Sequence, residues 1–145
     1  MSNPSKKKGT QAETKVVKYL ATFGIESERI ALHGSKDLGD IKIPYYSGEA
    51  TVLEVKTGKQ TANYSRKFLE EWKRQTITEY ENSDNKVCET ALVIVRYNRR
   101  IQDAEVFLPN WLWTTEPQNS GWTMMYLDEF AKQLLNYIER GFPPR

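Results

Sequence analysis

Two short apolar segments of this chain carry carboxylates at positions where a strand that faces a core gains nothing from them. Residues 39–43 read GDIKI, and residues 52–56 read VLEVK. If the two segments pair as a hairpin, Asp40 approaches Glu54 at one end of the pairing. Two carboxylates supply the hard oxygen donors that suit Mg²⁺ or Mn²⁺, and they leave water positions open on the ion. The spacing therefore predicts a metal site suited to hydrolysis.

A lysine accompanies the second carboxylate. Glu54 and Lys56 are two residues apart, so a strand projects both from the same face. Leu53 and Val55 then pack on the other face. A lysine beside a bound metal can orient or deprotonate the attacking water, or stabilise a pentavalent phosphate as negative charge develops. The alternative is an ordinary exposed salt bridge, worth less than about 1 kcal/mol.

The two segments together resemble the PD-(D/E)xK nuclease superfamily. Asp40 stands at the position of the first acid, and residues 54–56 match the E-x-K element, with Gly39 in place of the usual proline. Upstream, residues 8–13 (KGTQAE) are similar to the K-G-x-x-x-E helix of the archaeal and phage Holliday junction resolvases. Residues 24–29 (GIESER) resemble the G-(F/I/Y)-x-x-x-R strand of that family, and Ser35 matches its loop serine. The similarity covers residues 8 to about 97.

The resemblance implies a site, a cofactor and a substrate. The implied catalytic residues are Glu13, Ser35, Asp40, Glu54 and Lys56. It also implies that Mg²⁺, with Mn²⁺ able to substitute, is held by Asp40, Glu54, Glu13 and the backbone carbonyl of Val55. The implied substrate is branched DNA, especially the four-way junction. Symmetric cutting of a junction needs two active sites, so a homodimer is expected. The expected location is the cytoplasm of a bacterial or phage-infected host cell.

Positive charge is concentrated in the first two thirds of the chain. Residues 101–145 carry three basic and six acidic side chains, a net charge of −3. Because the whole chain has a net charge of +2, residues 1–100 carry a net charge of +5. A basic stretch with interleaved aromatics, such as residues 56–74, suits a phosphate backbone. The alternative is a solvated amphipathic helix with Phe68, Leu69 and Trp72 facing inward. The predicted DNA contacts are Lys8, Arg29, Lys36, Lys59, Tyr64, Arg66 and Lys67.

The elements that must position these residues follow from hydrophobic periodicity. The pattern predicts helices over residues 9–23, 65–80 and 127–140. Strands are expected over residues 28–32, 40–43, 51–56, 90–97 and 104–108. The order α-β-β-β-α-β-β-α predicts an α/β fold with a mixed central sheet flanked by helices, and the resemblance makes it restriction-endonuclease-like. Residues 1–8 are expected to form a flexible basic tail, 9–108 the nuclease core, and 109–145 an extension whose helix packs on the same domain.

Several single residues have a simpler interpretation. Taken alone, Glu13 is an acid near a helix start, where the dipole stabilises it by about 0.3–1 kcal/mol. His33 is more readily a loop residue than a general base. Gln75 stands at the edge of the expected site. The extension is interpreted as a dimer surface, a DNA wedge or a lid over the sheet, and its tryptophans as base-stacking or core residues: Trp111, Trp113 and Trp122.

Length and composition exclude several classes of protein. With 145 residues, 39% of them hydrophobic, the chain is the size of one domain with its own core. Cys88 is the only cysteine, which excludes an internal disulfide and a multi-cysteine zinc site. No apolar run approaches the roughly 18–20 residues of a membrane span, and no secretory signal is expected. Two alternatives stay open: a nuclease acting on linear duplex, and a non-catalytic nucleic-acid-binding protein of the same fold.

Overall fold

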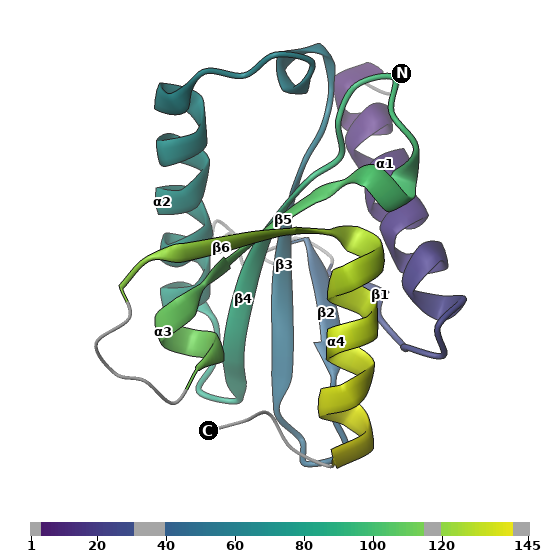
Figure 1. The fold of residues 1–145 in the computed structure, drawn as a ribbon, viewed down its shortest axis with the longest axis vertical. Coiled ribbons are helices and arrows are strands. Elements are labelled where there is room, and N and C mark those ends of the chain that lie inside the picture. The colour runs from purple at the N-terminus through teal and green to yellow at the C-terminus, as the bar shows by residue number, and fades with distance from the viewer. Residues whose placement is uncertain (1–3, 31–39, 115–119, 141–145) are drawn as a thin grey trace.

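The computed structural model describes residues 4–30, 40–114 and 120–140 of the chain. It is an α/β structure with one six-stranded sheet and helices on both faces (Figure 1). The strands are β1 (Glu28–Arg29), β2 (Ile41–Pro44), β3 (Ala50–Lys56), β4 (Val87–Ile94), β5 (Glu105–Pro109) and β6 (Trp122–Tyr126). The helices are α1 (Pro4–Ala21), α2 (Arg66–Asn82), α3 (Asn110–Trp113) and α4 (Leu127–Arg140), with short 3-10 turns η1 (Lys59–Thr61) and η2 (Ile101–Asp103).

The sheet is mixed, as the order of elements predicts. Its strands lie in the order β1-β2-β3-β4-β5-β6, so neighbours in sequence are neighbours in space. β3 and β4 are parallel, and every other pair is antiparallel. A parallel pair needs a crossover connection, and α2 supplies it. This connection brings α2 onto one face of the sheet, beside the carboxyl end of β3.

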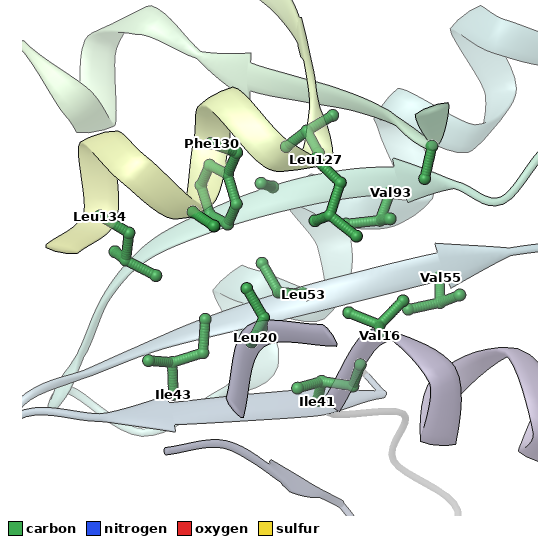
Figure 2. Packing of buried hydrophobic residues seen from close by; sticks show 14 of the residues in the cluster. Val16, Leu20, Ile41, Ile43, Leu53, Val55, Val93, Leu127, Phe130 and Leu134 are labelled. Carbon is green, nitrogen blue, oxygen red and sulfur yellow. The ribbon is translucent and has the colours of Figure 1, made fainter. Parts of the chain in front are cut away.

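The main core lies between the sheet and two helices, α1 and α4. Alternate residues of β3, Leu53 and Val55, are buried there with Val16 of α1 and Phe130 of α4 (Figure 2). The stripe predicted for α1 is confirmed, since Ala12, Val16 and Leu20 are buried. Residues 127–140 form a helix over the range that the pattern predicts, and this helix covers the sheet. The packing of α4 agrees with the interpretation of the extension as a lid over the sheet, while a dimer surface and a DNA wedge stay predictions.

The opposite face of the sheet is covered by α2 and is more polar. Its smaller apolar cluster joins Trp72 of α2 to Leu92, Ile94 and Phe107 of β4 and β5. The buried residues of α2 are Trp72, Thr76 and Glu79. Phe68, predicted to face inward, is 49% exposed and only stacks on the edge of the cluster. The prediction was wrong for Phe68, which lies in the first turn of α2, and it is confirmed for Trp72, which is buried, and for Leu69, which packs against the same cluster.

The structure differs from the predicted elements at the start of α1 and at β6. α1 begins at Pro4 rather than Gly9, because proline suits a first helical position and the lysines that follow are good helix formers. Residues 4–8, predicted as a tail, are therefore helical. The strand β6 was not predicted. Its burial pattern does not alternate, since it is an edge strand that pairs only with β5.

The strand predicted over residues 28–32 is described only as far as Ile30, and β1 covers Glu28–Arg29. A turn at residues 45–48 connects β2 to β3, with the N–H of Gly48 donating to the carbonyl of Tyr45 at 3.0 Å. Its φ of 90° at Gly48 lies in the left-handed region that glycine tolerates. Within the described part of the chain, no helix has the length and apolar character that crossing a bilayer would demand.

Candidate active site

Asp40 and Glu54 meet at the end of the β2–β3 hairpin, as predicted. Ile41 pairs with Leu53, so the next step of this antiparallel register places Asp40 opposite Glu54. The N–H of Asp40 donates to the carbonyl of Leu53 at 2.9 Å. The Asp40 carboxylate turns back onto β3, where its Oδ2 accepts a hydrogen bond from the N–H of Val55 at 2.8 Å. The backbone of β3 thus holds the Asp40 carboxylate at the end of the strand that carries Glu54.

Glu54 and Lys56 project from β3 toward α2. The Nζ of Lys56 lies 3.7 Å from Oε1 of Glu54, and the two side chains are 18% and 6% exposed. Leu53 and Val55 pack on the opposite face, as the spacing predicts. An exposed salt bridge, the simpler interpretation of this pair, is excluded by the burial. Charges in such a partly dehydrated site interact more strongly than the same charges in water.

The lysine has a second partner, on α2. Its Nζ donates a hydrogen bond of 2.7 Å to Oε1 of Gln75. The Nε2 of Gln75 in turn donates to Oε1 of Glu79 at 3.1 Å. Sequence reasoning placed Gln75 at the edge of the site and missed Glu79. The available signal was the spacing of four residues, which puts both on the face of α2 that also carries the buried Thr76.

Glu13 reaches the site from α1. Burial, followed by the negative charge of Asp40, raises the pKa of the Glu13 carboxyl above its usual range, while Arg29 opposes the shift. The pKa of Glu13 therefore senses the charge of Asp40. Because α1 begins at Pro4, Glu13 lies well inside the helix and is not an acid near its start. The position predicted by resemblance thus faces the hairpin.

Arg29 is the partner of Glu13 rather than a side chain free for a phosphate. Its Nε lies 3.3 Å from Oε1 of Glu13, and its Nη2 donates to Oγ1 of Thr10 at 3.4 Å. The arginine is 45% exposed at its side chain. The structure thus gives it a role in tying β1 to α1, and a DNA contact stays a prediction.

The other predicted DNA contacts fall into three groups. Lys59, Arg66 and Lys67 are exposed, on η1 and at the start of α2. These segments lie at the same end of the molecule as the carboxyl end of β3 (Figure 1). Lys8 belongs to α1. Ser35 and Lys36 lie outside the described residues, as does His33.

Tyr64 is engaged inside the protein. Its hydroxyl donates to a carboxylate oxygen of Glu105, and the guanidinium of Arg96 lies 5.1 Å from its ring centroid. Burial, then the hydrogen bond to Glu105, raises the pKa of the Tyr64 phenol. Arg96 also donates to the carbonyls of Thr61 and Ala62 at 2.6 and 2.7 Å. Sequence reasoning did not find this role of Arg96, whose contacts connect the segment after β3 to β5.

The tryptophans divide between core and surface. Trp113 is buried, stacks on Tyr137 and donates from Nε1 to the carbonyl of Thr90 at 2.9 Å, so it is a core residue. Trp111 is 38% exposed and makes an edge contact with Trp122. Lys73 of α2 lies 5.4 Å from the Trp122 ring centroid. Base stacking by Trp113 is therefore excluded in this fold.

The donor chemistry of the site fits a hard divalent cation in part. Asp40 and Glu54 stand opposite each other in the backbone register at one strand end, and their carboxylate oxygens are the donor type that Mg²⁺ prefers. Among residues 4–30, 40–114 and 120–140, no group of three or more His, Cys, Asp or Glu side chains is arranged to hold a metal. Glu13, the third carboxylate implied by resemblance, is paired with Arg29. The carbonyl of Val55 as a ligand stays a prediction.

No protein-family model matches this chain, and no curated protein matches it.

Proposed function

We propose that this protein is a metal-dependent DNA endonuclease that hydrolyses phosphodiester bonds. The observation that carries the proposal is the largely buried pair of Glu54 and Lys56 at the carboxyl end of β3, together with the Asp40 carboxylate that accepts a hydrogen bond from the N–H of Val55 at the same strand end. A buried carboxylate beside an ammonium contributes little to stability, because removing two charges from water is costly. Groups of this kind are more often found at functional sites.

The topology supports the same proposal. Three antiparallel strands, a crossover helix, a parallel strand and a further antiparallel strand follow α1 in chain order. This is the order of elements expected for a restriction-endonuclease-like core, with the E-x-K segment on the central β3. We therefore propose that fold as the finer description of the mixed sheet.

Each residue has a defined role in the proposed reaction. Asp40 and Glu54 would hold Mg²⁺, with Glu13 and the Val55 carbonyl as further ligands, and Mn²⁺ would substitute. The bound ion would supply positive charge to a phosphate oxygen and lower the pKa of water. The N–H of Val55 keeps Asp40 in place. The ammonium of Lys56 is placed to orient the attacking water or to neutralise charge that develops on the phosphate.

The proposed substrate is branched DNA, above all the four-way junction, cut by a homodimer. This finer proposal depends on the resolvase resemblance of residues 8–13 and 24–29. The exposed Lys59, Arg66 and Lys67, at the same end as the site, are suited to sequence-independent phosphate contacts. A contribution from Ser35, which lies outside the described residues, is part of the same proposal.

A cleavage assay tests the proposal directly. A synthetic four-way junction and its separate linear arms are incubated with the wild type and with Glu54→Ala, in Mg²⁺ and in EDTA. We expect paired, symmetric cuts in the junction alone, lost with EDTA and with the substitution. Equal cutting of the linear arms would keep the nuclease and overturn the junction preference. Binding without cutting, unchanged by Mg²⁺, would instead indicate a non-catalytic DNA-binding protein.

A further inference from the structure

A continuous set of hydrogen bonds connects the candidate catalytic lysine to a buried carboxylate on the face of α2 that packs against the sheet. Lys56 donates to Gln75 at 2.7 Å, and Gln75 donates to Glu79 at 3.1 Å. Glu79 is 3% exposed. Gln75 thus joins a charged group at the site to a buried carboxylate on the far side of the amide.

The helix geometry explains why these residues line up. Gln75 and Glu79 are four residues apart on α2 and therefore lie one above the other on the same face. Trp72 and Thr76 on the same helix pack toward the sheet, which sets the rotation of α2. Lys56 extends from the end of β3 toward this face. The packing of Trp72 therefore brings the Gln75 amide to the lysine.

The partners of Gln75 decide which way its amide faces. An ammonium only donates hydrogen bonds, and an ionised carboxylate only accepts them. The Gln75 amide lies between Lys56 and Glu79, and only one orientation lets it hydrogen-bond to both side chains. In that orientation Oε1 accepts from the lysine ammonium and Nε2 donates to the carboxylate. That is the orientation in the structure. The carboxylate of Glu79 thus determines that the lysine meets an acceptor and not a second donor.

Glu79 is not explained by stability. Its Oε2 is buried and has no hydrogen-bond partner among residues 4–30, 40–114 and 120–140, and burying an incompletely bonded carboxylate costs free energy. An apolar side chain in the same place, beside Trp72 and Thr76, would avoid that cost. Groups that are retained at a cost to folding are typical of functional sites.

We propose that Glu79 is a positioning residue that fixes Lys56 through the Gln75 amide. Glu79 orients the amide, and the amide oxygen together with Glu54 holds the ammonium at the end of β3. The inference rests on the proposed nuclease function for its consequence, though not for its geometry. Glu79 touches neither substrate nor metal in this arrangement and acts only through its neighbour.

The test uses Glu79→Gln, which keeps the size of the side chain. Because the new amide both donates and accepts hydrogen bonds, the Gln75 amide can then flip and exchange the positions of its oxygen and nitrogen. Single-turnover cleavage of a four-way junction in Mg²⁺ should slow by roughly 10- to 100-fold, the range for loss of a supporting partner at a reacting group. Junction affinity should stay unchanged. Gln75→Leu should reproduce the loss. Glu81→Gln, the same change at an exposed position of α2, is the matched control and should cleave at the wild-type rate.

Two further measurements separate positioning from a structural role. In a Lys56→Ala background, Glu79→Gln should cause no further loss of rate, because the group it positions is gone. Thermal unfolding of Glu79→Gln should occur at or above the wild-type temperature. A full rate for Glu79→Gln, or an equal loss in the Lys56→Ala background, would overturn the inference.

A readout without activity keeps this inference separable from the proposed function. The side-chain amide of Gln75, identified in ¹H–¹⁵N spectra of the full chain by its absence in Gln75→Leu, should shift in Glu79→Gln and not in Glu81→Gln. If the wild type cuts no DNA, the nuclease proposal fails, and this spectrum still decides whether Glu79 holds the amide. An unshifted amide resonance would overturn the positioning role whatever the enzyme cuts.

Discussion

Two buried glutamates on adjacent parallel strands have different surroundings. Glu54 of β3 is 5% exposed and Glu89 of β4 is 0% exposed. Glu54 lies near the carboxyl end of its strand, beside the ammonium of Lys56. Glu89 lies near the amino end of its strand, on the face covered by α1 and α4, and accepts a hydrogen bond from Oγ1 of Thr51 at 2.8 Å.

The difference shows that burial of a carboxylate does not by itself identify a site. Around Glu89 the neutral hydroxyls of Thr51 and Tyr45 form a hydrogen-bonded set, and burial followed by the Glu89 charge raises the pKa of the Tyr45 phenol. Around Glu54 the neighbours are charged and lie where the strand ends. We interpret the first as a structural network and the second as the reactive one.

The largest expected effect is the loss of cleavage in Glu54→Gln. The substitution keeps the shape and removes the charge, so we expect the cleavage rate to fall by about 10²- to 10⁴-fold, as for other positioned charged groups. The free energy of unfolding should also fall, by up to about 3–5 kcal/mol, because the largely buried ammonium of Lys56 loses its counter-charge. The cleavage rate is therefore measured per folded molecule. Single-turnover assays measure the cleavage rate, and urea titrations measure the free energy of unfolding. Full activity would remove the distinction between the two glutamates.

Thr51→Val tests the other glutamate. It removes the hydroxyl that donates to Glu89 while keeping the volume, so we expect a loss of about 1.5–3 kcal/mol of stability, the value of a hydrogen bond to a charged group. The cleavage rate per folded molecule should stay at the wild-type level. Urea unfolding measures the stability, and a cleavage assay well below the melting temperature measures the rate per folded molecule. A slow but fully stable variant would show that the Glu89 network serves the reaction.

The smallest expected effect is a pH dependence in Glu13→Gln. The pKa of Glu13 is raised in the folded protein, so at neutral pH its ionised form disfavours folding. As pH falls through that raised pKa, the folded state takes up a proton before the unfolded state, and the penalty disappears. Without divalent metal, the variant should therefore be more stable than the wild type near pH 7, and the two should converge near pH 4.5. A difference that grows on acidification would contradict the raised pKa.

Much of the fold could be predicted because its elements have clear periods. The stripe of Val16 and Leu20 and the alternation of Leu53 and Val55 are local patterns, and the structure confirms both. β6 could not be predicted in the same way. In residues 122–126 only Trp122 and Met125 are partly buried, and their spacing of three does not give the period of two that indicates a strand.

The candidate site was only partly accessible from sequence. The hairpin rule brings Asp40 to Glu54, because antiparallel register follows from a short turn. The buried Glu79 was missed because a glutamate four residues after Gln75 also occurs on any solvated helix. Its depth depends on how Trp72 rotates α2 against the sheet.

The amino-acid sequence by itself determined that Glu54 and Lys56 share one face of a strand, since the backbone alternates side chains wherever that strand lies. Only the tertiary structure decided that this face meets α2, that Lys56 finds Gln75, and that α1 places Glu13 where it senses the charge of Asp40. The physical reason is that periodicity is a property of a few consecutive residues. Contacts between distant segments depend instead on how whole surfaces pack together.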